Sequence, residues 1–112
     1  MGKAYGFIEI QGVVPATVAL DEMCKAANVT LATWERKLGG RLVTLVVEGD
    51  ISDCEAAVNA AMRNPLKPIA SHGVIANPHP EIVKLVELSQ KRWKKTPPDG
   101  GETEDQKYLQ EV

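Results

Sequence analysis

The spacing of apolar residues changes repeatedly along this chain, and the order of these changes limits the folds that it can adopt. Apolar and polar residues alternate over Tyr5–Gln11, which predicts a strand. After Pro15 the apolar residues recur at intervals of three and four, which predicts an amphipathic helix. Two strand-like runs follow, Val29–Glu35 and Arg41–Glu48. Because two glycines lie between these runs, we expect a hairpin connection there.

The second half of the chain predicts a helix, a strand and another helix. Ser52 and Glu55 have the spacing of a capping box, which favours a helix start at Ser52. A fourth strand is expected over Ile69–Ala76, and a third helix after Pro80 closes with the cations of Lys91–Lys95. This order predicts an α+β fold with one four-stranded antiparallel sheet and helices on one face. The arrangement is a split βαβ unit, a variant of the ferredoxin-like fold.

Charge and breaker residues divide the chain into a body and a tail. Residues 96–112 contain five acidic residues and one basic residue, and they begin with the breaker cluster Pro97–Gly101. We therefore expect one domain over residues 1–95 and a mobile acidic tail over residues 96–112. With a net charge of −2, the chain lacks the basic field that nucleic acid would require.

Neither a membrane span nor a secretory leader is expected. The longest strongly apolar stretch, Leu42–Val47, is far shorter than a membrane-spanning helix, and polar residues interrupt the first apolar run. The chain is therefore expected in the cytoplasm. Cys24 and Cys54 have no metal-ligand spacing, so we expect two reduced, structural thiols and no metal site. For catalysis, the chain shows no nucleophile beside a base, no paired carboxylates and no phosphate-binding glycine loop.

Four short blocks occur in an order that resembles a known family. They are Ala4–Glu9, Met23–Val29, Leu42–Asp50 and the pair Pro78-His79. Together they cover about residues 4–88 and are similar to the hexamer-forming, BMC-domain shell proteins of bacterial microcompartments. The resemblance implies a cyclic homohexamer that tiles into a protein layer of the compartment shell, limits diffusion and passes small polar or anionic metabolites through an axial pore. It also implies contact with other shell proteins and with encapsulated enzymes, and it requires no cofactor.

The resemblance also assigns two groups of residues. The glycine-rich loop would line the pore, through Lys37, Leu38, Gly39, Gly40 and Arg41. The hexamer edge, where neighbouring hexamers meet, would contain Lys25, Asn28, Asn77, Pro78 and His79. The loop is one residue longer than in the family pattern, so Arg41 faces either the pore or a subunit interface. Many relatives carry arginine where this chain has Asn77, which predicts weaker or differently arranged layers.

Other functions remain open on the residues alone. Without the resemblance, the residues alone favour an ordinary solvated hairpin tip for Lys37 and Arg41. Split βαβ sheets also form oligomeric regulatory domains that bind small molecules between subunits, and a small enzyme on the same sheet would require an acid/base site. Trp34 could be a packing residue or a subunit contact. Structural roles are expected for His72 and His79.

Overall fold

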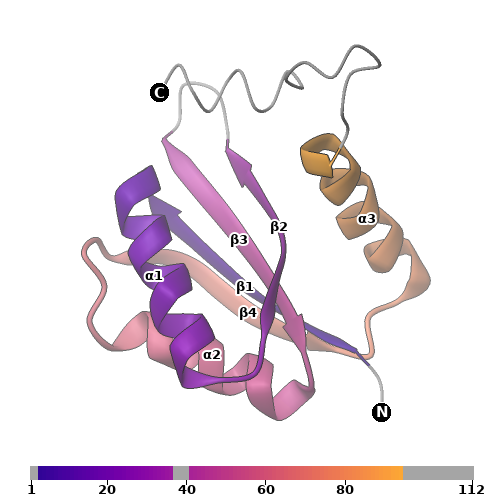
Figure 1. The fold of residues 1–112 in the computed structure, drawn as a ribbon, viewed down its shortest axis with the longest axis horizontal. Helices are drawn as coiled ribbons and strands as arrows, with labels where there is room; N and C mark the ends of the chain where they lie inside the picture. Colours follow the sequence, from indigo (N-terminus) through magenta and orange to yellow (C-terminus); the bar gives the residue numbers. More distant parts are fainter. Residues whose placement is uncertain (1–2, 37–40, 95–112) are drawn as a thin grey trace.

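The computed structural model describes residues 3–36 and 41–94, and within them the chain forms one sheet of four strands. These are β1 (Ala4–Gln11), β2 (Thr30–Arg36), β3 (Leu42–Gly49) and β4 (Ile69–Ala76). The strands lie in the order β2-β3-β1-β4, and all neighbours are antiparallel (Figure 1). The predicted antiparallel sheet is confirmed, and each strand boundary agrees with the sequence prediction to within one residue.

Three helices connect or follow the strands: α1 (Val13–Ala26), α2 (Ile51–Arg63) and α3 (Pro80–Lys94). Helix α1 begins before the predicted start at Pro15. Gly12 makes this possible, because its φ of 100° lies in a region that residues with a Cβ rarely adopt and turns the chain directly from β1 into the helix. Pro15 then lies within the first turn of α1, where no backbone N–H is needed.

The predicted capping box at the start of α2 is wrong. The helix begins at Ile51, and no side chain makes a capping hydrogen bond to it. Asp50 is the residue before the first turn, and its carbonyl oxygen accepts the backbone N–H of Cys54 at 2.9 Å. Ser52 therefore lies inside the first turn, where its hydroxyl cannot act as the cap. The carboxylate of Asp53 instead accepts the backbone N–H of Asn28 at 3.3 Å.

The main core lies between one face of the sheet and the helices α1 and α2. Its largest fully buried side chains on the strands are Ile8, Ile10, Val43, Leu45 and Val47. Gly6 lies under α2, and a Cβ at this position would be 3.1 Å from Cγ2 of Val58. Because Gly6 has no side chain, α2 can approach β1 closely with its face of small residues.

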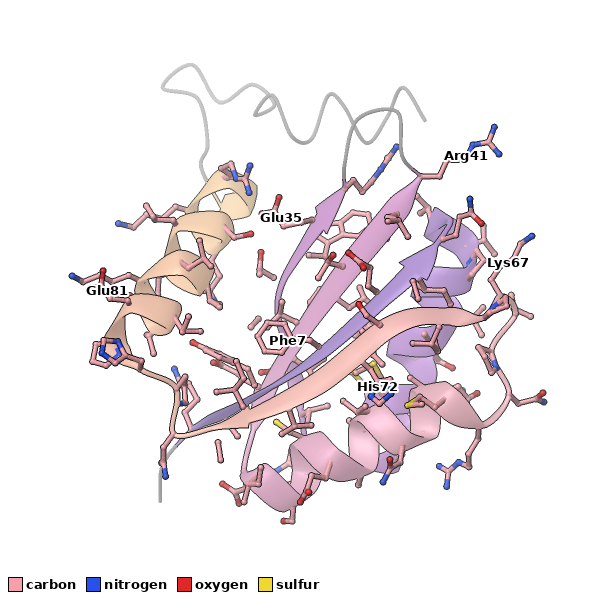
Figure 2. The ribbon with its side chains drawn as sticks, turned by 180° about the vertical axis from the view of Figure 1, so that it is seen from behind. Phe7, Glu35, Arg41, Lys67, His72 and Glu81 are labelled. Carbon is pink, nitrogen blue, oxygen red and sulfur yellow. The ribbon has the colours of Figure 1, made fainter. Side chains whose placement is uncertain are left out.

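Helix α3 covers the opposite face of the sheet. There it packs through Val86 in a second cluster with Tyr5 and Val46. The expectation that all helices lie on one face is therefore wrong for α3, although it holds for α1 and α2 (Figure 2). The reason is that side chains alternate along a strand, so Tyr5 and Phe7 point away from the main core and require cover on the other side.

Candidate pore loop, edge residues and groove

The connection between β2 and β3, assigned from sequence to the pore, lies at one end of the sheet. Gln11, the last residue of β1, pairs with Leu42 at this end. The backbone N–H of Gly12 donates a hydrogen bond of 2.8 Å to the carbonyl oxygen of Arg41, which fixes this end of the hairpin to β1. Arg41 has a φ of 61°, which is uncommon for a residue other than glycine. Its side chain is exposed and projects away from the sheet (Figure 2).

The other four residues assigned to the pore, Lys37, Leu38, Gly39 and Gly40, lie outside the described residues. The described residues on either side, Arg36 and Arg41, show that these four connect two antiparallel neighbours of the sheet.

The residues assigned to the hexamer edge lie at the opposite end of the sheet. At that end Ala4 pairs with Gly49 on one side and with Ala76 on the other. Asn77 follows Ala76 directly, and the carbonyl oxygen of Asn28 lies 2.9 Å from where a Cβ on Gly49 would be. Because β1 has eight residues, and a strand rises about 3.3 Å per residue, the edge residues and the hairpin are about 25 Å apart. The two assigned groups are thus separated by the length of the domain.

Lys25 and Asn28 are exposed near the end of α1, and each has a partner within the chain. Nζ of Lys25 lies 2.7 Å from Oδ2 of Asp21, one helical turn earlier. The hydrogen bond and the charge of Asp21 raise the pKa of the Lys25 ammonium group. Asn28 donates its backbone N–H to Asp53, which joins the end of α1 to the first turn of α2.

The segment from Asn77 to His79 redirects the chain from β4 into α3. Asn77 has a φ of 48°, a left-handed conformation that asparagine tolerates well. Nδ1 of His79 accepts the backbone N–H of Glu81 at 3.1 Å, and its carbonyl oxygen accepts the N–H of Ile82 at 2.8 Å. His79 therefore caps α3, a structural role of the kind expected, although the sequence analysis did not identify the cap. A histidine two residues before an acidic first turn was the available signal.

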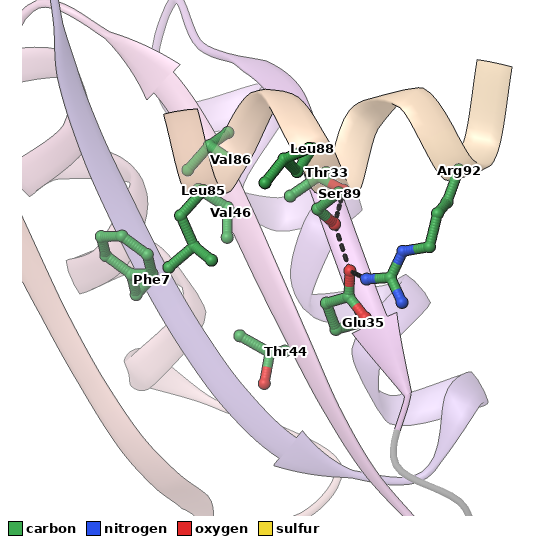
Figure 3. Close-up of a pocket in the computed structure, with 10 residues that line it drawn as sticks. All are labelled: Phe7, Thr33, Glu35, Thr44, Val46, Leu85, Val86, Leu88, Ser89 and Arg92. Carbon is green, nitrogen blue, oxygen red and sulfur yellow. Dashed lines mark hydrogen bonds and ion pairs between the residues drawn. The ribbon is translucent and has the colours of Figure 1, made fainter. Parts of the chain in front are cut away.

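A groove that no sequence pattern predicted lies between α3 and the sheet. The groove has a volume of about 500 Å³, and its apolar wall comes from Phe7, Val46, Leu85, Val86 and Leu88 (Figure 3). We refer to it as the α3 groove. Its lining joins β1, β2 and β3 to α3 and contains few polar atoms except at one end.

A polar cluster closes that end of the α3 groove. Oγ1 of Thr33 and Oγ of Ser89 are 2.6 Å apart, and both residues are buried. Ser89 also donates a hydrogen bond to the carboxylate of Glu35, which forms an ion pair with Arg92 (Figure 3). These contacts fasten the second half of α3 to β2. The signal in the sequence was a serine within the apolar stripe of the third helix.

The cysteines and Trp34 have different environments. Both thiols are free, but Cys24 is exposed, whereas Cys54 is fully buried with its Sγ 3.4 Å from the carbonyl oxygen of Ala4. Burial, with a smaller contribution from the charge of Asp53, raises the pKa of the Cys54 thiol. Trp34 is half-buried and packs against the main core, which agrees with a packing role.

Within residues 3–36 and 41–94, no three histidine, cysteine, aspartate or glutamate side chains gather as a metal site would require. The helices in these same ranges are all too short or too polar to cross a bilayer.

Comparison with known proteins identifies the family. The model of the BMC domain matches residues 4–78. The bacterial microcompartment shell protein PduA of Salmonella typhimurium is 40% identical over 87 residues, which cover 75% of this chain and 90% of that protein. The carboxysome shell protein CsoS1A of Hydrogenovibrio crunogenus is 40% identical over 94 residues, covering 80% of this chain and 96% of that protein.

A solved structure shows the same fold. It is that of a microcompartments protein from Desulfitobacterium hafniense, with a TM-score of 0.69, 20% identity and 80% of this chain covered. This chain spans 49% of the length of that one. The chain therefore belongs to the BMC-domain family of bacterial microcompartment shell proteins. Its role is structural, in the shell of a cytoplasmic bacterial microcompartment, where it assembles with itself and with other shell proteins.

Proposed function

We propose that the chain forms a cyclic homohexamer with the β2–β3 connection around the axis and the Asn28 and Asn77 end at the rim. The observation that carries this proposal is the position of the two groups at opposite ends of the sheet, about 25 Å apart by the rise of its strands. A ring requires head-to-tail contacts, so that each subunit presents different surfaces to its two neighbours. With one group at the axis, the other can reach adjacent hexamers and support tiling.

The pore of this hexamer would favour small polar or anionic metabolites. Arg41 is exposed at the hairpin end, and among the described residues no carboxylate pairs with it. Lys37 adds a second cation to each subunit, and sixfold repetition around the axis would concentrate the field. Glu35, on the strand before the loop, is held by Arg92 and Ser89, so its negative charge is partly compensated within the subunit. The glycines Gly39 and Gly40 would let the backbone approach the passing solute.

The mass in solution tests the hexamer. Light scattering of the full chain should give about 73 kDa, six times the 12.2 kDa of one chain. A monomer or dimer at micromolar concentration would remove the hexamer. It would instead favour the alternative of a small-molecule-binding regulatory domain, which the relatives of this chain do not favour.

Anion passage tests the pore. In reconstituted layers, Lys37→Ala and Arg41→Ala should each lower the preference for anions, and the preference should weaken as salt rises. Lys91→Ala is the matched control, because Lys91 is an exposed cation on α3. If Arg41→Ala changes assembly but leaves anion preference intact, Arg41 lies in a subunit interface and Lys37 is the pore cation. Unchanged preference in both loop variants with the hexamer preserved would contradict a pore governed by cations.

The proposal assigns the shell domain to residues 1–95 and leaves residues 96–112 as a separate acidic tail. It includes no catalytic step and no cofactor. Contact with encapsulated enzymes fits a layer that has an inner face. The match to the family model ends at residue 78, so the tail lies outside the matched part.

A further inference from the structure

We propose that the α3 groove is a binding site for a small amphiphile, a molecule with a short apolar chain or ring and one uncharged polar head group. This site is separate from the proposed pore, because the groove lies between α3 and the sheet, whereas the pore loop joins β2 to β3. All the residues that line it come from a single chain. Ligand binding here would be added to the structural role of the shell.

The size and the lining of the α3 groove fit a molecule of this kind. Its volume is about 500 Å³, and small-molecule sites usually have volumes of about 300–1,000 Å³. Phe7 and Val46 line the groove from β1 and β3, and Leu85 and Leu88 line it from α3 (Figure 3). An apolar chain between these side chains would remove apolar surface from water on both sides, which favours binding.

The apolar side of α3 is held in place although its leucines are not covered. Leu85 and Leu88 are 63% and 61% exposed, whereas Val86 is only 4% exposed. Val86 packs with Tyr5 and Val46 and so keeps this part of the helix on the sheet. A ligand would therefore cover the leucines without moving the helix, and binding to such a preformed site has a small entropic cost.

The ion pair of Glu35 and Arg92 supplies the polar end of the site. Oε2 of Glu35 accepts hydrogen bonds from both Ser89 and Nη2 of Arg92. Within the described residues, these contacts leave Oε1 of Glu35 and the other N–H groups of Arg92 for a ligand. Both side chains can be reached from solvent, since they are 36% and 58% exposed.

A pair of opposite charges at the end of an apolar groove selects an uncharged head group. Glu35 would repel an anion, Arg92 would repel a cation, and either ligand charge would lose hydration on entering the groove. A hydroxyl or a primary amide can instead donate to Glu35 and accept from Arg92 at the same time. Because hydrogen bonds to charged groups are stronger than those between neutral groups, this end of the groove would fix the orientation of the ligand.

Methyl NMR spectroscopy of the full chain tests the site. In a titration with 1-hexanol, the methyl signals of Leu85 and Leu88 should shift and saturate at one ligand per chain. The methyl signals of Val14 should not shift, because Val14 is 67% exposed on α1, which covers the other face of the sheet. Shifts that grow without saturation, or that are equally large at Val14, would overturn the proposal.

Substitutions in the apolar wall give the matched comparison. Leu85→Asn and Leu88→Asn should each raise the Kd for 1-hexanol about tenfold, because each removes apolar surface that the ligand would cover. Val14→Asn, at an equally exposed position, should leave the Kd unchanged. Circular dichroism should show that all three variants remain folded, since the replaced side chains are more than half exposed. An unchanged Kd in both leucine variants would place the ligand elsewhere.

Variants of the ion pair test the selection of the head group. The unaltered chain should bind 1-hexanol and hexanamide about fivefold more tightly than hexanoate or hexylamine. Arg92→Gln leaves Glu35 without its cation and should shift the preference to hexylamine, whereas Glu35→Gln leaves Arg92 unpaired and should shift it to hexanoate. Glu55→Gln, at an exposed carboxylate on α2, should not change the order of affinities. The same order in both ion-pair variants would contradict the assigned polar end.

Discussion

The hydroxyl pair between α3 and the sheet should make a measurable contribution to stability. Thr33 and Ser89 are 5% and 8% exposed, and their oxygens are 2.6 Å apart. Replacing Ser89 with alanine removes a hydrogen bond to the carboxylate of Glu35 and leaves the Thr33 hydroxyl buried without this partner. An unsatisfied buried polar group costs about 1–3 kcal/mol. Ser89→Ala should therefore lower the free energy of unfolding by about 2 kcal/mol.

A double substitution separates the unpaired hydroxyl from the rest of the effect. Thr33→Val removes the hydroxyl that Ser89→Ala leaves without its partner. The two changes together should therefore lower the free energy of unfolding by less than the sum of the single changes, with a coupling of about 1 kcal/mol. Ser52→Ala is the control, since Ser52 makes no capping bond at the start of α2, and its effect should stay within about 0.5 kcal/mol.

Urea unfolding followed by circular dichroism measures these differences. All variants must be compared at one protein concentration, because association stabilises the folded subunit by mass action. A Ser89→Ala variant as stable as the unaltered chain would refute the account of α3 as a helix fastened by this cluster. Additive effects of Ser89→Ala and Thr33→Val would show that the two hydroxyls act independently.

Three further predictions concern the thiols, the hexamer edge and the tail. The pKa of Cys54 is raised above its ordinary value of 9.0 in the folded chain, so the unfolded thiol loses its proton first and the free energy of unfolding should fall as pH rises above about 9; this slope should disappear in Cys54→Ala. Asn77→Arg should strengthen layer formation in electron micrographs, because a guanidinium group makes more simultaneous bonds than an amide, and extensive layers in the unaltered chain with no gain would contradict this. Truncation after Lys95 should leave the mass of the assembly and its thermal midpoint unchanged, whereas a large loss of stability would show that residues 96–112 pack.

The secondary structure could be predicted well because its signals are local. Alternation over Tyr5–Gln11 predicted β1 to within one residue, the strand expected over Ile69–Ala76 was found with the same bounds, and the spacing after Pro15 predicted α1. The start of α2 was mispredicted because the Ser52 and Glu55 spacing matches a capping box, whereas the turn at Asp50 had already begun the helix. The spacing of Ser52 and Glu55 does not include the backbone conformation at Asp50, and that conformation decides where the helix begins.

The candidate site divides in the same way. The family resemblance assigned residues to a pore loop and to an edge, but their placement at opposite ends of the sheet depends on strand pairing, such as that of Ala4 with Gly49 and of Gln11 with Leu42. The cap at His79 depends on a turn whose conformation Asn77 sets. Such positions follow from contacts between elements, which spacing along the chain does not record.

The sequence by itself determined which side chains share a face of each element, and with its motif blocks it determined the family. Tertiary structure decided which face each helix covers. The periodicity of the third helix predicts an apolar stripe around Val86, but this stripe could be buried against either face of the sheet. In the folded chain α3 packs on the face of the sheet that contains Tyr5. This packing brings Thr33 into contact with Ser89, which is 56 positions away in the sequence. Because packing against a sheet is a long-range contact, only the folded chain shows that α3 packs chiefly against β2.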